Sequence, residues 1–139
     1  MIKQFSENFR KGFWTALYEY LIVTLPVAIY VMLEAIHKKS WIVFITTPEW
    51  SIATIFLAFI SISRYRSSLE KSGGRIFEPI FGLISILSLI LIVGSTINAY
   101  LSLEEETISA IVIRIVLFIV SSMKFLVLIT GSKLLQQSK

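Results

Sequence analysis

Four long apolar stretches fill most of this 139-residue chain, and charged residues interrupt them at only a few positions. They cover Phe13–Ile36, Trp50–Ser63, Phe77–Leu101 and Thr107–Thr130. The hydrocarbon core of a bilayer requires about 20 predominantly apolar residues per crossing helix, and fewer where polar ends reach the interface. The pattern therefore predicts an all-α fold, a polytopic membrane protein with four transmembrane helices.

The low content of charged residues supports this class. Charged residues make up 16% of the chain and hydrophobic residues 55%, whereas a soluble domain usually has about 25% charged residues. So little charge cannot cover a water-facing surface, but it suits contact with a lipid bilayer. We expect a single membrane domain over residues 1–139, with spans at about 13–36, 48–66, 77–101 and 105–131 and a cytoplasmic loop at 67–76.

The composition also argues against several kinds of chemistry. The chain has no cysteine and one histidine, so neither a disulfide framework nor a clustered metal site is expected. The hydroxyl side chains have no credible histidine–acid partner, and no glycine-rich phosphate loop precedes a helix. We therefore predict that the protein is not an enzyme and holds no cofactor.

Cations gather on one side of the predicted spans. That side carries Lys3, Arg10, Lys11, Arg64, Arg66, Lys71, Arg75, Lys133 and Lys139. The other side has only Lys38 and Lys39, beside an acidic run at 104–106. The positive-inside rule assigns the cation-rich side to the cytoplasm, so we expect an inner-membrane protein with both termini cytoplasmic.

The same rule accounts for the basic pI, near 9.5, without a nucleic-acid partner. Four of the cations lie between the second and third spans: Arg64, Arg66, Lys71 and Arg75. We expect this group to contact a cytosolic protein partner or anionic lipid at the cytoplasmic face.

Prolines and caps mark the expected helix boundaries. Pro26 lies near the middle of the first span and should kink it, either as a static packing feature or as a hinge. Pro48 followed by Glu49 should open the second helix, which can continue past the membrane as far as Gly73-Gly74. A capping box that starts at Ser102 places the beginning of the fourth helix there.

A few charged residues lie at membrane depth, where a charge near a helix centre costs about 2.5–3.5 kcal/mol on insertion scales. Glu19 and Lys124 are at similar distances from the cytoplasmic ends of the first and fourth spans, so we expect them to pair. Arg114 lies near the outer end of the fourth span. We expect it to contact Glu34 or Glu49, the outer acids nearest that level.

Arg114, Ser121 and Lys124 are separated by seven and three residues, so they share a broad face of the fourth helix. Three interpretations are open. The stripe can be a structural polar seam inside the bundle, or its long side chains can extend to the two interfaces. It can also line a water-filled pore or substrate path in an oligomer.

Leu25-Pro26 and Pro48-Glu49-Trp50-Ser51 resemble sequences of small four-helix bacterial membrane proteins from phage-defence loci. The resemblance implies an oligomeric inner-membrane component that senses infection, or that depolarises or permeabilises the membrane, together with a cytosolic partner. It assigns no individual functional residue. Small multidrug transporters also use a glutamate of the first helix, but the strong cation bias of this chain disfavours their dual topology.

These observations favour a homo-oligomeric bundle that acts as a pore-forming effector or a membrane sensor. One bundle of four helices is too thin to enclose both a core and a channel, so a pore would need several copies. Two alternatives remain: a small proton-coupled transporter that uses Glu19, and a non-conducting scaffold subunit whose buried charges are purely structural.

Overall fold

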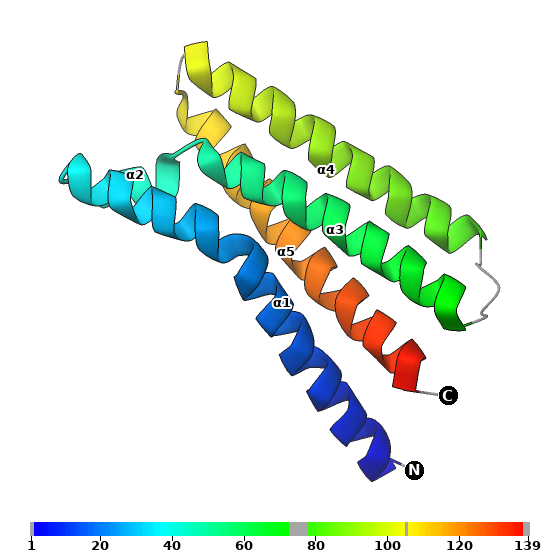
Figure 1. The fold of residues 1–139 in the computed structure, drawn as a ribbon. Helices are drawn as coiled ribbons and strands as arrows, with labels where there is room; N and C mark the ends of the chain where they lie inside the picture. The colour runs from blue at the N-terminus through cyan, green and yellow to red at the C-terminus, as the bar shows by residue number, and fades with distance from the viewer. Residues whose placement is uncertain (1, 73–77, 105, 138–139) are drawn as a thin grey trace.

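The computed structural model describes residues 2–72, 78–104 and 106–137. Within these residues the chain is 93% helix and has no strand, which confirms the all-α prediction. The helices are α1 (Ile2–His37), the short α2 (Ile42–Thr46), α3 (Glu49–Ser72), α4 (Glu78–Glu104) and α5 (Ile108–Gln137) (Figure 1).

Three of the described helices are long and apolar enough to cross a membrane. The suitable segments are Ser6–His37 in α1, Ile80–Glu104 in α4 and Ile108–Leu134 in α5. The 25 residues of the α4 segment rise about 37 Å, which exceeds the hydrocarbon core of about 30 Å. The chain is therefore a helical protein that suits a membrane location.

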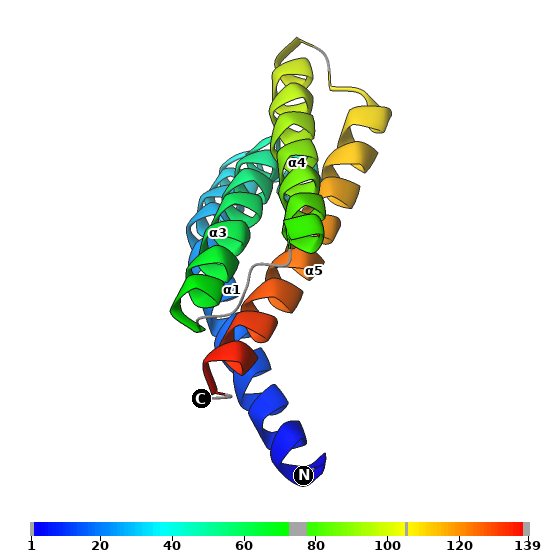
Figure 2. The same ribbon diagram turned by 90° about the vertical axis from the view of Figure 1, so that its right-hand side faces the viewer.

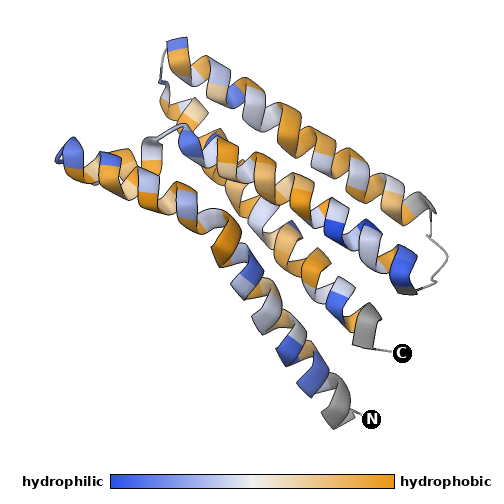
Figure 3. Cartoon of the chain, in the orientation of Figure 1, coloured by the Kyte–Doolittle hydropathy of each residue, from blue (hydrophilic) through white to orange (hydrophobic). Residues whose placement is uncertain are grey.

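Helix α3 packs against all three of these helices. Figures 1 and 2 show α3, α4 and α5 side by side. Helices α1 and α4 lie on opposite sides of the α3–α5 pair. The two chain termini, the end of α3 and the beginning of α4 lie at the same end of the bundle (Figure 1). Strongly hydrophilic residues gather towards the helix ends (Figure 3).

Helix α1 is bent, and Pro26 lies inside it. Figure 1 shows that the part before the bend runs beside α5, whereas the part after it turns away beside α2. Proline lacks the N–H that would bond the carbonyl four residues earlier, and its ring pushes that carbonyl away. The predicted kink is therefore confirmed, and motion about it stays a prediction.

The interior of the bundle is made mainly of small and polar side chains. On α4 the buried positions Ser88, Leu91, Ser95 and Asn98 are three or four residues apart, so they form one stripe. Their helix exposes leucine and isoleucine on its other faces. Small residues allow helices to approach closely in lipid, where apolar side chains gain little by leaving the lipid tails.

Several boundaries differ from the sequence expectations. Ser102 does not begin a helix: it lies inside α4, and its hydroxyl donates to the Asn98 carbonyl at 2.8 Å. Helix α5 instead begins after Thr107, whose Oγ1 accepts from the Ala110 N–H at 3.2 Å. Residues 67–72 of the expected loop are helical, because α3 continues as far as Ser72; the glycine pair after it lies outside the described residues. Residue 105 and Arg75 lie outside the described residues.

Candidate functional site

Arg114 is the largest fully buried side chain in the described structure, with 1% of its surface exposed. Its Nε donates to Asn98 Oδ1 at 3.2 Å and its Nη1 contacts Glu106 Oε1 at 3.2 Å. Further bonds run from Nη1 to the Thr46 carbonyl and from Nη2 to the Ser102 hydroxyl. A guanidinium has five N–H donors in a rigid fork, so these contacts satisfy most of them.

The Arg114 contacts join four parts of the chain: the end of α2, two turns of α4, the α4–α5 connection and α5 itself. Asn98 extends the junction, because its Nδ2 donates to the Ala110 carbonyl at 2.8 Å. The expected Arg114 partners, Glu34 and Glu49, are therefore wrong. The part of α1 that carries Glu34 turns away after the bend. Glu106 lies eight residues before Arg114, just ahead of the beginning of α5, and helical side chains point towards the N-terminal end of their helix.

Lys124 lies in the middle of α5, sixteen residues after its beginning at Ile108 and so about 24 Å along the helix. Only 9% of the residue is exposed. Its Nζ donates to the Ala58 carbonyl at 3.2 Å and contacts Ser61 Oγ at 3.0 Å. Both partners belong to α3 and both are neutral. None of the ion pairs between described residues includes Lys124.

Glu19 does not pair with Lys124, which corrects the second expected contact. Its Oε1 lies 3.2 Å from the Nζ of Lys133. Lys124 and Lys133 are nine residues apart, and nine residues turn an α-helix by about 180°. The two lysines therefore leave opposite sides of α5, Lys124 towards α3 and Lys133 towards α1.

Ser121 completes the polar stripe of α5. Its Oγ donates to the Thr54 carbonyl of α3 at 3.1 Å, and none of its surface is exposed. Arg114, Ser121 and Lys124 thus do share a face, and it is turned into the chain. We call the Ser121 and Lys124 contacts with α3 the polar seam. Burial keeps these side chains off the outer surface of this chain. Extension towards an interface stays an open interpretation for Arg114, whose side chain reaches the partly exposed Glu106 before the beginning of α5.

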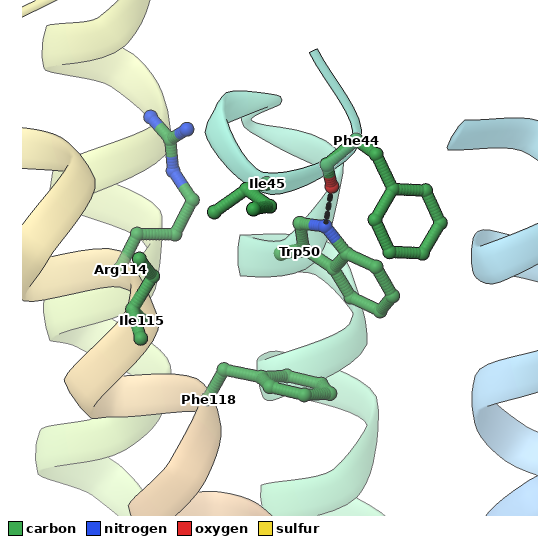
Figure 4. A pocket seen from close by; sticks show the side chains of 6 residues that line it. All are labelled: Phe44, Ile45, Trp50, Arg114, Ile115 and Phe118. Carbon is green, nitrogen blue, oxygen red and sulfur yellow. Dashed lines mark hydrogen bonds between the residues drawn. The ribbon is translucent and has the colours of Figure 1, made fainter. Parts of the chain in front are cut away.

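An apolar cavity lies beside Arg114, at the junction of α2, α3 and α5. It has a volume of about 170 Å³ and is lined by Phe44, Ile45, Trp50, Arg114, Ile115 and Phe118. Figure 4 shows the Trp50 ring between those of Phe44 and Phe118, with the Arg114 guanidinium directed away from the rings. The Trp50 Nε1–H donates to the Phe44 carbonyl at 2.6 Å, which fixes α2 against the beginning of α3.

A second opening lies at the bend of α1, between α1 and α3. It has a volume of about 370 Å³ and is lined by Pro26, Val27, Tyr30, Glu49 and Ile52. We call it the α1–α3 groove. The Glu49 Oε2 atom is buried and has no hydrogen-bond partner in the described structure.

The remaining candidate residues lie at the ends of the bundle. Lys38 contacts Glu34 Oε1 at 2.6 Å, and this hydrogen bond and charge attraction raise the pKa of Lys38. At the other end Arg66 pairs with Glu70 at 2.9 Å, with both side chains exposed. Arg64 and Lys71 are also exposed, so they extend the cationic end of α3.

Sequence reasoning missed the partners of the buried cations. Asn98, Ser102 and Glu106 hold Arg114, and Ser61 holds Lys124. A signal was present for the first two, because Asn98 and Ser102 continue the polar stripe of α4 at a spacing of four residues. Ser61 stands in a helix with several serines and threonines, so nothing in the sequence separates it from them.

The fold and the site together define a helical membrane-type protein with a buried polar interior. No protein-family model, no curated protein and no solved structure matches the chain. The relation to phage-defence membrane proteins therefore stays a prediction from two short sequence patterns.

Proposed function

We propose that the protein crosses the membrane four times, with α3 as the fourth transmembrane helix. Helix α3 packs on α1, α4 and α5, and its outward side chains are large and apolar. Ile52, Phe56 and Phe59 are 47%, 51% and 62% exposed. Apart from Leu57, its buried positions are small or polar, which lowers its mean hydropathy without placing polar groups in lipid.

The proposed orientation has both termini and the α3–α4 connection in the cytoplasm, at the inner membrane. The cation distribution supports it, as does the position of both termini and the end of α3 at one end of the bundle (Figure 1). Exposed cations of α3 would then meet anionic lipid or a cytosolic protein partner.

Within this arrangement we infer that the protein is a membrane sensor, or a pore-forming effector whose opening is controlled by the same sensing step. The observation that carries this proposal is the position of Lys124: a cation at mid-span, buried against α3 and held only by a carbonyl and a hydroxyl. Charged residues inside transmembrane segments are rare, and they are usually paired or functional. Between described residues, no ion pair includes Lys124, so a buried ion pair does not explain its position.

The polar seam would be the part that responds. A unit charge that moves across the membrane changes its energy by about 2.3 kcal/mol per 100 mV, and a cation at mid-span experiences part of that potential. Separation of α5 from α3 would expose Ser121 and Lys124. The outward faces of the spans are mostly apolar, so in this proposal the opening supplies the polar lining that a conducting path in a homo-oligomer needs.

Cysteine accessibility tests the proposal directly, because the chain contains no cysteine and each introduced thiol is unique. Ser121→Cys is placed in liposomes, and its reaction with a membrane-impermeant thiol reagent is measured while a potassium diffusion potential of either sign is imposed. We expect a slow reaction at zero potential and a reaction at least five-fold faster at one polarity. Lys124→Met in the same background should abolish the response.

Ser109→Cys serves as the matched control, because Ser109 lies at the exposed beginning of α5 and should react at every potential. Equal protection of Ser121→Cys at all potentials would count decisively against a potential-driven opening. Chloride flux from the same liposomes distinguishes the effector from a sensor that does not conduct.

One observation favours the scaffold as a second candidate. Arg114 is nearly saturated with hydrogen bonds inside the chain, as expected of a residue that only holds helices together. A scaffold predicts that Ser121→Cys stays protected and that Lys124→Met changes stability alone. The transporter alternative rests on Glu19, which pairs with Lys133 near the end of α5.

A further inference from the structure

The α1–α3 groove combines apolar walls with one carboxylate. Val27 and Tyr30 of α1 face Ile52 of α3 across it, and Glu49 at the beginning of α3 supplies the acid. Its volume of about 370 Å³ lies within the range of small-molecule sites, roughly 300–1,000 Å³. Sites of this kind usually join a mostly apolar lining to a few polar groups that fix the orientation of the ligand.

The Glu49 carboxylate is incompletely satisfied. Its Oε2 is buried without a hydrogen-bond partner in the described structure. A buried oxygen that lacks a donor is costly, and more so when it carries charge. The positive end of the α3 dipole offsets part of that cost, but it provides no donor to this atom.

The nearby cations are held by other residues. The ammonium group of Lys38 is attracted electrostatically to Glu49. Its direct ion pair, however, is with Glu34, whose Oε1 lies 2.6 Å from the Lys38 Nζ. Arg114 also interacts with Glu49 through charge, but its hydrogen bonds go to Asn98, Ser102 and Glu106. Among the described residues Glu49 therefore forms no salt bridge, and its carboxylate faces an apolar groove with one buried oxygen that lacks a donor.

From this geometry we propose that the α1–α3 groove binds an organic ammonium or phosphonium cation with apolar substituents. The charge pairs with Glu49, and the substituents fill the space between Val27 and Ile52. The ring of Tyr30 adds an attraction, because aromatic faces bind cations. The bend at Pro26 forms the groove by turning the second part of α1 away from α3. The proposal is independent of the polar seam.

The test uses tetraphenylphosphonium as the probe and the full chain in detergent micelles. Equilibrium dialysis against protein-free micelles gives the specific binding. We expect saturable binding of about one cation per chain, and at least ten-fold weaker affinity for Glu49→Gln. Glu104→Gln should bind within two-fold of wild type, because Glu104 lies at the exposed end of α4 and does not line the groove.

A second variant keeps the test decisive if Glu49→Gln folds poorly. Ile52→Trp fills the groove from the exposed side of α3 and leaves every charge in place, so it should also lose binding by at least five-fold. The neutral triphenylphosphine oxide should bind wild type more weakly than the cation. Absence of saturable binding by wild type, or equal affinity of wild type and both groove variants, overturns the proposal.

The cation could be a soluble molecule or the ammonium headgroup of a lipid. Nanodiscs of phosphatidylglycerol alone, compared with discs that also contain phosphatidylethanolamine, distinguish the two sources. Loss of probe binding in the ethanolamine discs assigns the site to a lipid headgroup, and unchanged binding assigns it to a soluble cation. Both results keep Glu49 as the counter-ion.

Discussion

Two cations are buried on α5, and the structure predicts opposite effects when each is replaced by methionine. Methionine keeps most of the volume of either side chain and removes the charge. Lys124 donates to two neutral acceptors of α3, whereas Arg114 holds groups from three other parts of the chain. The free energy of unfolding in mixed detergent micelles is the quantity that separates them.

For Lys124→Met the gain exceeds the loss. Two interhelical hydrogen bonds disappear, at about 0.6 kcal/mol each in a membrane protein. The cost that disappears with them is that of a cation at mid-span, about 2.5–3.5 kcal/mol. No acceptor is orphaned, because the Ser61 hydroxyl already donates to the Ala58 carbonyl at 3.0 Å. We expect the free energy of unfolding to rise by about 1–2 kcal/mol.

For Arg114→Met the loss exceeds the gain. The change leaves Asn98 Oδ1 and the Thr46 carbonyl without their donor, and each buried orphan costs about 1–3 kcal/mol. Glu106 is 41% exposed, so water screens its charge and its loss adds little. We expect the free energy of unfolding to fall by about 2–4 kcal/mol, and α2 to lose its attachment to α5.

Titration with sodium dodecyl sulfate, followed by circular dichroism, measures both variants and the double variant. Arg114 and Lys124 are ten residues apart, about 15 Å along the helix, so their effects should add. Destabilisation of about 1 kcal/mol or more by Lys124→Met would refute the reasoning, because it would show that the lysine has a compensating partner.

Three smaller predictions concern α1. A double-mutant cycle with Glu19→Gln and Lys133→Gln should give a coupling of about 0.5–1 kcal/mol in the same titration, since the pair is partly exposed; zero coupling would contradict the contact. Gly12→Leu should destabilise by about 1–3 kcal/mol and Gly12→Ala far less, because a Cβ there lies 3.6 Å from the Lys133 Cβ. Pro26→Ala should straighten α1 and weaken binding of tetraphenylphosphonium, and unchanged affinity would separate the groove from the bend.

The local signals in the sequence predicted the helices well. Pro48 and Glu49 mark the beginning of α3, because these residues act through backbone geometry that needs no tertiary contact. The predicted stop at the glycine pair lies outside the described residues. The shared face of Arg114, Ser121 and Lys124 also follows from helical periodicity alone.

The partners of the charged residues could not be predicted in the same way. Depth along a helix was estimated from the sequence, but the direction in which Lys124 leaves α5 relative to α1 depends on how the helices are placed around one another. The bend at Pro26 has a similar effect, because it carries Glu34 away from the level of Arg114. Contacts of this kind depend on tertiary packing rather than on any one segment.

In the proposed four-span arrangement, the packing of α3 against α4 and α5 has a consequence for how the chain enters the membrane. When segments are inserted in order of synthesis, α3 emerges before α5, whose Ser121 and Lys124 contact the Thr54 carbonyl and the Ser61 hydroxyl. Its low hydropathy makes it the weakest segment to insert by itself, and its partners on α5 are made last. Stable insertion of α3 therefore depends on a later helix, and a chain truncated before α5 should present α3 to membrane quality-control proteases.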